Sequence, residues 1–89
     1  MKVFIATKRM VDYKNPSEGW QHLFGSFKQS KDAYTVILED ICRHMERMAL
    51  WCEVIHDAPN RWIITDFCGD NKPQKRRSWI FKITEVDID

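Results

Sequence analysis

The side chains best suited to hold a metal ion in this sequence are two cysteines and a histidine. Cys52 and His56 are four residues apart, and Cys68 follows the next predicted strand. In an extended strand, residues four apart are separated by about 13 Å, too far for two ligands of one tetrahedral ion. The chain also lacks a CxxC or HxxxH pair. We therefore expect no metal site and no cofactor.

Three carboxylates around a predicted hairpin are a second possible source of chemistry. Glu53, Asp57 and Asp66 could meet on adjacent strands and form the pocket of a small metal-dependent enzyme. Acidic residues near a hairpin are more often solvated, and no nucleophile-elbow or phosphate-loop motif is present. We expect a protein that is not an enzyme, and keep the metal-dependent enzyme as an alternative.

A basic segment precedes the last predicted strand, beside a tryptophan. Its members are Lys72, Lys75, Arg76 and Arg77, followed by Trp79. Arginine with tryptophan suits phosphate contact and base stacking, and also the anchors of protein interfaces. We therefore predict that residues 61–86, including Arg61 and Trp62, carry a partner contact. The alternatives are a solvated loop that keeps the sheet edge from pairing, and tryptophans that belong to the core.

Net charge, cysteine count and the length of apolar stretches indicate which partners and which cellular compartment the protein has. The net charge is +1, which argues against a protein dedicated to coating nucleic acid or to a polybasic membrane anchor. Three cysteines are an odd count for a small secreted domain, and the first ten residues lack the apolar run of a signal peptide. No stretch reaches the roughly 20 apolar residues of a membrane span. We expect a cytoplasmic protein with no membrane partner.

The hydrophobic pattern predicts a single α+β domain over residues 1–89, in the order β-β-α-β-β-β. One amphipathic helix, at 31–50, should pack on a mainly antiparallel sheet. The expected strands are 2–10, 20–27, 52–56, 61–67 and 78–86. The continuous apolar run of residues 3–6 is typical of a strand covered on both faces.

The predicted helix has a broad apolar face and an acidic outer face. We expect it to bury Tyr34, Ile37, Ile41 and Met45. The outer face is predicted to present Asp32, Glu39, Asp40 and Glu46, interrupted by Arg43 and Arg47. Glu39 and Glu46 are candidate partner residues if this face imitates a row of phosphates. The alternative is a solvated face in which Glu39 pairs with Arg43.

A sheet with one helix leaves its second face open to water. Adjacent strand residues point to opposite faces, and the pairs Ile63–Ile64 and Trp79–Ile80 are apolar on both sides. Such a sheet has surplus apolar surface, which indicates a protein partner.

The first half of the chain resembles a pattern of small phage and prophage accessory proteins. The matching phrases are KVFIAT, LFGSF and SKDAYTVIL, and the resemblance covers about residues 2–40. It implies a module that binds a host protein or complex in the host cytoplasm, such as an inhibitor of restriction or CRISPR components. No functional residue carries over from it. Alternative partners are nucleic acid, bound through the basic segment, and a second copy of the chain.

Overall fold

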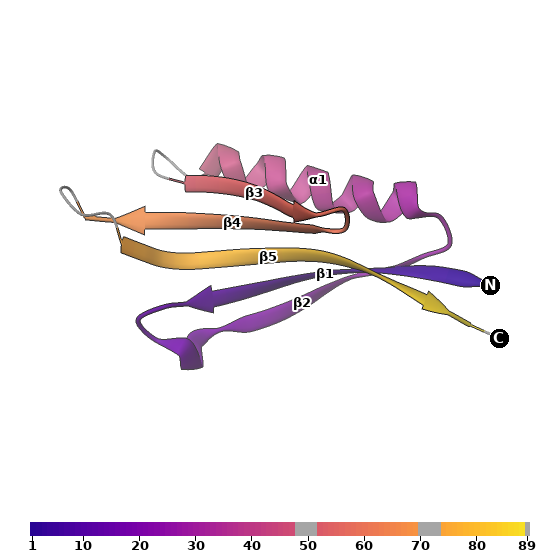
Figure 1. The fold of residues 1–89 in the computed structure, drawn as a ribbon, viewed down its shortest axis with the longest axis horizontal. Helices are drawn as coiled ribbons and strands as arrows, with labels where there is room; N and C mark the ends of the chain where they lie inside the picture. Colours follow the sequence, from indigo (N-terminus) through magenta and orange to yellow (C-terminus); the bar gives the residue numbers. More distant parts are fainter. Residues whose placement is uncertain (48–51, 70–73, 89) are drawn as a thin grey trace.

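The computed structural model describes residues 1–47, 52–69 and 74–88. Its element order is β-β-α-β-β-β with one short extra turn, which confirms the predicted α+β fold (Figure 1). The elements are β1 (Lys2–Asp12), the 3-10 helix η1 (Pro16–Glu18), β2 (Trp20–Phe27), α1 (Ser30–Arg47), β3 (Cys52–Ala58), β4 (Arg61–Cys68) and β5 (Gln74–Asp87).

The five strands form one antiparallel sheet in the order β2-β1-β5-β4-β3. The first and last strands therefore lie side by side in its centre, and the two termini meet at one end (Figure 1). There, the amino group of Met1 donates to the carbonyl of Ile88, whose own N–H donates back to the Met1 carbonyl. This central pairing brings residues from the two ends of the sequence into contact.

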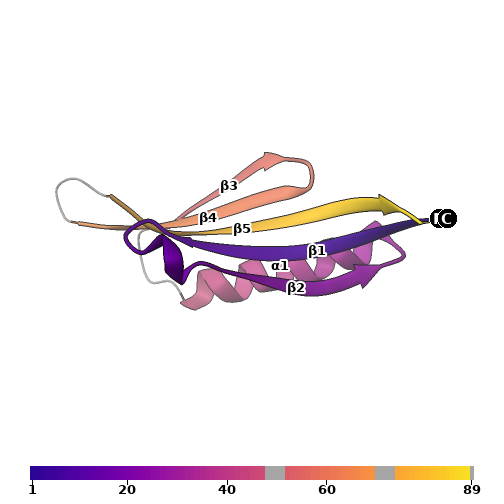
Figure 2. The same ribbon diagram turned by 90° about the horizontal axis from the view of Figure 1, so that it is seen from below.

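The helix covers one face of the sheet, and Figure 2 shows the opposite side without a covering element. The core lies between the helix and the sheet face that it covers. Ala33 and Ile37 of α1 and Phe81 of β5 are fully buried there. The other core residues are Ala6, Met10, Ile41, Trp62, Ile64, Trp79 and Ile83. On the last strand, Trp79, Phe81 and Ile83 are buried together on this face.

A salt bridge crosses this interface. Lys8 points from β1 toward the helix, and its Nζ lies 2.8 Å from Oδ2 of Asp40. Both side chains are largely buried, at 15% and 20% exposure. The prediction that Asp40 points into solvent is wrong, because Lys8 draws its carboxylate toward the sheet. Arg43 also contacts Asp40, at 3.9 Å, so the expected Glu39–Arg43 pair is not the one that forms.

The helix is rotated relative to the predicted buried face. Ile37 and Ile41 are buried as expected, but Met45 is 37% exposed and Leu38 is 46% exposed. The reason is that α1 packs against β1, β2 and β5. Its flank toward β3 and β4 is less covered. Tyr34 still reaches that side, donating to the carbonyl of Pro59, and positions 48–50 of the predicted helix lie outside the described residues.

Candidate functional site

The sheet face opposite α1 is built from alternate residues of every strand. Odd-numbered residues of β1 and even-numbered residues of β5 lie on it, because their neighbours Lys8, Trp79 and Phe81 face the helix. The expectation that the first strand is covered on both faces is therefore wrong. Val3 and Ile5 lie on this open face and stay partly exposed, because no element in the described part of the chain packs over them.

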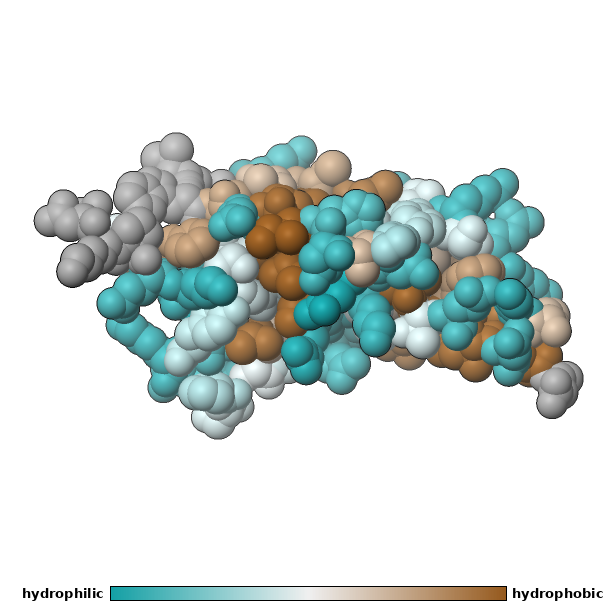
Figure 3. Space-filling model, in the orientation of Figure 1, coloured by the Kyte–Doolittle hydropathy of each residue, from teal (hydrophilic) through white to brown (hydrophobic). Residues whose placement is uncertain are grey.

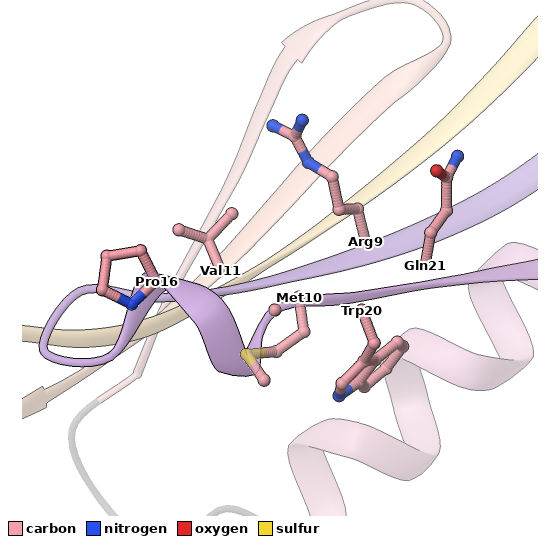
Figure 4. Close-up of a pocket in the computed structure, with 7 residues that line it drawn as sticks. Arg9, Met10, Val11, Pro16, Trp20 and Gln21 are labelled. Carbon is pink, nitrogen blue, oxygen red and sulfur yellow. The ribbon is translucent and has the colours of Figure 1, made fainter.

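Three cations lie close together near the middle of the open face. Thr7, Lys82 and Arg61 are successive cross-strand partners on β1, β5 and β4. Arg9 is two residues along β1 from Thr7, and Figure 4 shows it beside Gln21 of β2, both pointing away from the helix. These side chains, with Ile80, line a hollow of about 280 Å³. We call Arg9, Arg61 and Lys82 the cation row.

The cation row is electrostatically unfavourable in the isolated chain. Lys82 and Arg61 are directly opposite each other, and like charges in that position destabilise a sheet. The nearest compensation is Asp57, whose Oδ2 lies 3.4 Å from Nη1 of Arg61. Across the described strands β2, β1 and β5, this face carries no carboxylate. Arg9 and Lys82 therefore lack a counter-charge in their own strands.

Aliphatic side chains flank the cation row on the same face. Ile80 pairs with Ile63, which pairs with Ile55, so three isoleucines cross β5, β4 and β3 in one line. Leu23 of β2 pairs with Thr7, so Leu23 lies in the same cross-strand line as Lys82 and Arg61. The Leu23 side chain is 61% exposed. Figure 3 shows a hydrophobic band across the strands, with hydrophilic residues between it and a second apolar area near the termini.

At the end of the open face away from the termini, three hydroxyl groups form a chain of hydrogen bonds. Oη of Tyr13 is hydrogen-bonded to Oγ of Ser78 at 2.9 Å, and Ser78 is hydrogen-bonded to Oγ1 of Thr65 at 2.7 Å. Ser78 and Thr65 are consequently buried, although no helix lies over them. The exposed part of the face thus begins at the line of isoleucines and continues toward the termini.

Residues 74–77 of the predicted basic segment belong to β5, which begins at Gln74. Arg77 Nε lies 3.2 Å from Asp12, and Arg76 Nε lies 3.4 Å from Asp66, so both guanidinium groups are neutralised by carboxylates of neighbouring strands. The pKa of Asp12 lies below its usual value, chiefly because its carboxylate accepts from the Asn15 N–H, with a further contribution from Arg77.

The remaining predicted partner residues are divided between the core, the helix surface and the open face. Trp62 and Trp79 are 7% and 9% exposed, so both indoles belong to the core and are not surface anchors. Glu39 and Glu46 are exposed on α1, away from the cation row. Lys75 is exposed and lies over the Tyr13 ring, whereas Lys72 lies outside the described residues. Of the predicted residues whose positions the structure describes, Arg61 alone joins the cation row.

The residues considered for metal chemistry are not brought together. Glu53 pairs with Thr65, so it lies on the opposite face from Asp66, and Asp57 is at the other end of β3, paired with Arg61. Cys52 contacts Met45, and His56 stacks on Trp62. Within the described parts of the chain, no three His, Cys, Asp or Glu side chains are placed to share a metal ion.

The surroundings of His44 displace its pKa. Its ring packs against Trp79, with centroids 4.2 Å apart, and its Nε2 is buried without a hydrogen-bond partner among the described residues. Burial lowers the pKa of His44, and the positive charge of Lys8 lowers it further. The ring therefore serves as a neutral packing surface at the C-terminal half of α1.

Comparison of the chain with protein-family models, with curated proteins and with solved structures found no match. In the ranges that the structure describes, no helix is both long and apolar enough to cross a membrane. The fold and the open face together define a small α+β domain with one covered and one bare sheet face.

Two members of the cation row, Arg9 and Lys82, were not identified from the sequence. A local signal was present for Lys82, which lies between the apolar residues Phe81 and Ile83, whereas Arg9 follows another cation, Lys8. Their proximity, however, depends on the pairing of β1 with β5, which the local pattern does not reveal.

Proposed function

We propose that this chain is a non-enzymatic binding protein that docks the open face of its sheet onto another protein. The observation that carries the proposal is the combination of exposed aliphatic side chains with a cation row in which only Arg61 has a carboxylate partner. Leu23 and Ile55 are 61% and 41% exposed at opposite sides of this face. Exposed apolar area bordered by charge is typical of a protein interface.

A protein partner is favoured over nucleic acid by the chemistry of the face. Sheets that bind single-stranded nucleic acid stack bases on exposed aromatic side chains. The side chains around the cation row are instead aliphatic or polar, namely Thr7, Gln21, Leu23, Ile63 and Ile80. The more specific prediction of a phage-type inhibitor of a host complex rests on the resemblance of residues 2–40 and remains a prediction.

Affinity capture from the cells of origin, with paired variants as bait, tests the proposal. The open-face bait carries Leu23→Asp and Ile55→Asp, and the control bait carries Leu38→Asp on the exposed flank of α1. We expect a protein that wild type and the control retain and that the open-face variant loses. Loss with the control alone, or with a Glu39→Lys/Glu46→Lys bait alone, would place the contact on the helix and contradict the proposal. Melting curves verify that every bait is folded.

A further inference from the structure

We propose that the hollow around Arg9, Arg61 and Lys82 binds carboxylates of an acidic partner segment that also presents aliphatic side chains. This inference rests on the proposed docking face and specifies the chemistry of what covers it. The hollow carries a net positive charge. Three cations and one carboxylate, Asp57, leave a local charge of +2 on a face whose central strands have no other acid.

Repulsion between neighbouring cations destabilises the isolated sheet. Arg61 and Lys82 occupy directly opposed positions, where oppositely charged or β-branched pairs would stabilise the sheet. An anion seated between them removes the repulsion, so the binding partner supplies the compensation that the isolated chain lacks. Guanidinium groups suit this role because they can hold carboxylates in a bidentate manner.

The surroundings of the hollow specify the rest of the partner segment. Ile80 lies in the hollow itself, and Ile63 and Ile55 continue from it toward the β3 edge. Residues on one face of a strand are about 7 Å apart, so the isoleucine line runs directly beside the cation row. A segment that covers both must carry acidic and aliphatic side chains next to each other. A second copy docked through its own cation row would oppose cations to cations.

The cation row is accessible to a partner. Arg9, Gln21, Arg61 and Lys82 are all exposed, and no helix or loop of the described chain covers them. By contrast, Arg76 and Arg77 at the other end of β5 have carboxylate partners within the fold. Both arginines at that end thus have a carboxylate partner, whereas in the cation row only Arg61 has one.

The test uses the full chain, labelled with ¹⁵N, and a dodecapeptide of Gly-Glu-Val repeats. Matched probes are the Gly-Gln-Val dodecapeptide, a thymidine dodecanucleotide and inorganic phosphate. We expect the glutamate peptide to cause saturable amide shifts at residues 9, 61, 80 and 82, and to bind at least about tenfold more tightly than the glutamine peptide. Lys82→Glu should weaken binding by about tenfold or more. Lys28→Glu, an equal charge change on an exposed residue before α1, should leave affinity within about twofold.

Four results would overturn the inference: no saturable shift, equal binding of the two peptides, tighter binding of the oligonucleotide at these residues, or equal occupation by phosphate alone. If the peptides cause no saturable shift or bind equally, the proposed docking face still stands, provided that the aspartate substitutions at Leu23 and Ile55 abolish capture. Loss of the inference and loss of the proposed function are thereby distinguishable. The Lys82→Glu variant is expected to melt at a higher temperature than wild type, so loss of binding cannot be attributed to unfolding.

Discussion

The two faces of the sheet place different side chains at adjacent positions of the same strands. Along β5, Phe81 and Ile83 are buried beneath α1, whereas Lys82 between them is exposed on the open face. Along β1, Lys8 on the covered face has an acidic partner in the helix, whereas Arg9 on the open face has none in its own strands. On the open face, Asp57 pairs with Arg61 alone, and this difference between the faces underlies the proposal that the covered face serves stability and the open face serves binding.

The largest expected difference separates the neighbours Phe81 and Ile80. Phe81→Ala should lower the free energy of unfolding by about 3–5 kcal/mol, because it opens a cavity under the helix. Ile80→Ala removes a half-buried side chain and should cost no more than about 1 kcal/mol. Urea denaturation of both variants measures the contrast. Equal losses would mean that the open face is covered in solution.

A smaller contrast is expected between the adjacent cations Lys8 and Arg9. Lys8→Met leaves the Asp40 carboxylate without its principal partner beneath the helix and should cost about 1–3 kcal/mol. Arg9→Met should change stability by about 0.5 kcal/mol or less, because the side chain is exposed. If Asp40→Leu added to Lys8→Met restores most of the loss, the penalty arises from the unpaired carboxylate. No restoration would contradict that explanation.

Lys82→Glu should stabilise the fold, by about 0.2–1 kcal/mol, because it converts a repulsive pair with Arg61 into an attractive one. The difference should shrink as salt is added, since the charges are exposed. Lys75→Glu is the control at a position away from Arg61 and should show no such gain. A destabilised Lys82→Glu variant would refute the view that the cation row is retained at a cost to stability.

The smallest effect concerns pH and the covered face. Because the pKa of His44 is lowered in the fold, the unfolded chain takes up a proton below about pH 6.5 while the folded ring stays neutral. Stability should therefore fall as pH drops from 6.5 toward the folded pKa. His44→Phe should flatten this part of the profile, which thermal melts between pH 5 and 8 can measure. An unchanged slope would show that His44 is readily protonated within the fold.

Local patterns in the sequence were sufficient to predict the element order and much of the core. Alternation placed Trp79, Phe81 and Ile83 on one face, and the 3.6-residue period identified α1 with Ile37 and Ile41 inward. The same period could not predict which flank of the helix would be covered. That flank depends on the strand order, which leaves Met45 and Leu38 exposed on the side of β3 and β4.

The candidate site was predicted only in part, because its residues meet through long-range pairing. Arg61 was identified from its own segment, whereas Lys82 and Arg9 come together only through the register of β1 with β5. The same limitation explains the basic segment. Arg77 is neutralised by Asp12 across that pairing, so a run of charges that looked available in the sequence is engaged within the fold.

Site-specific photocrosslinking in the cells of origin tests the division between the two faces most directly. A photoreactive benzoylphenylalanine replaces Leu23 on the open face in one variant and Leu38 on α1 in the other, since both leucines are exposed. The account predicts a covalent adduct with a protein from position 23, none from position 38, and loss of the adduct when Lys82→Glu is added. An adduct with a protein from position 38 alone, or an adduct with nucleic acid from position 23, would contradict it.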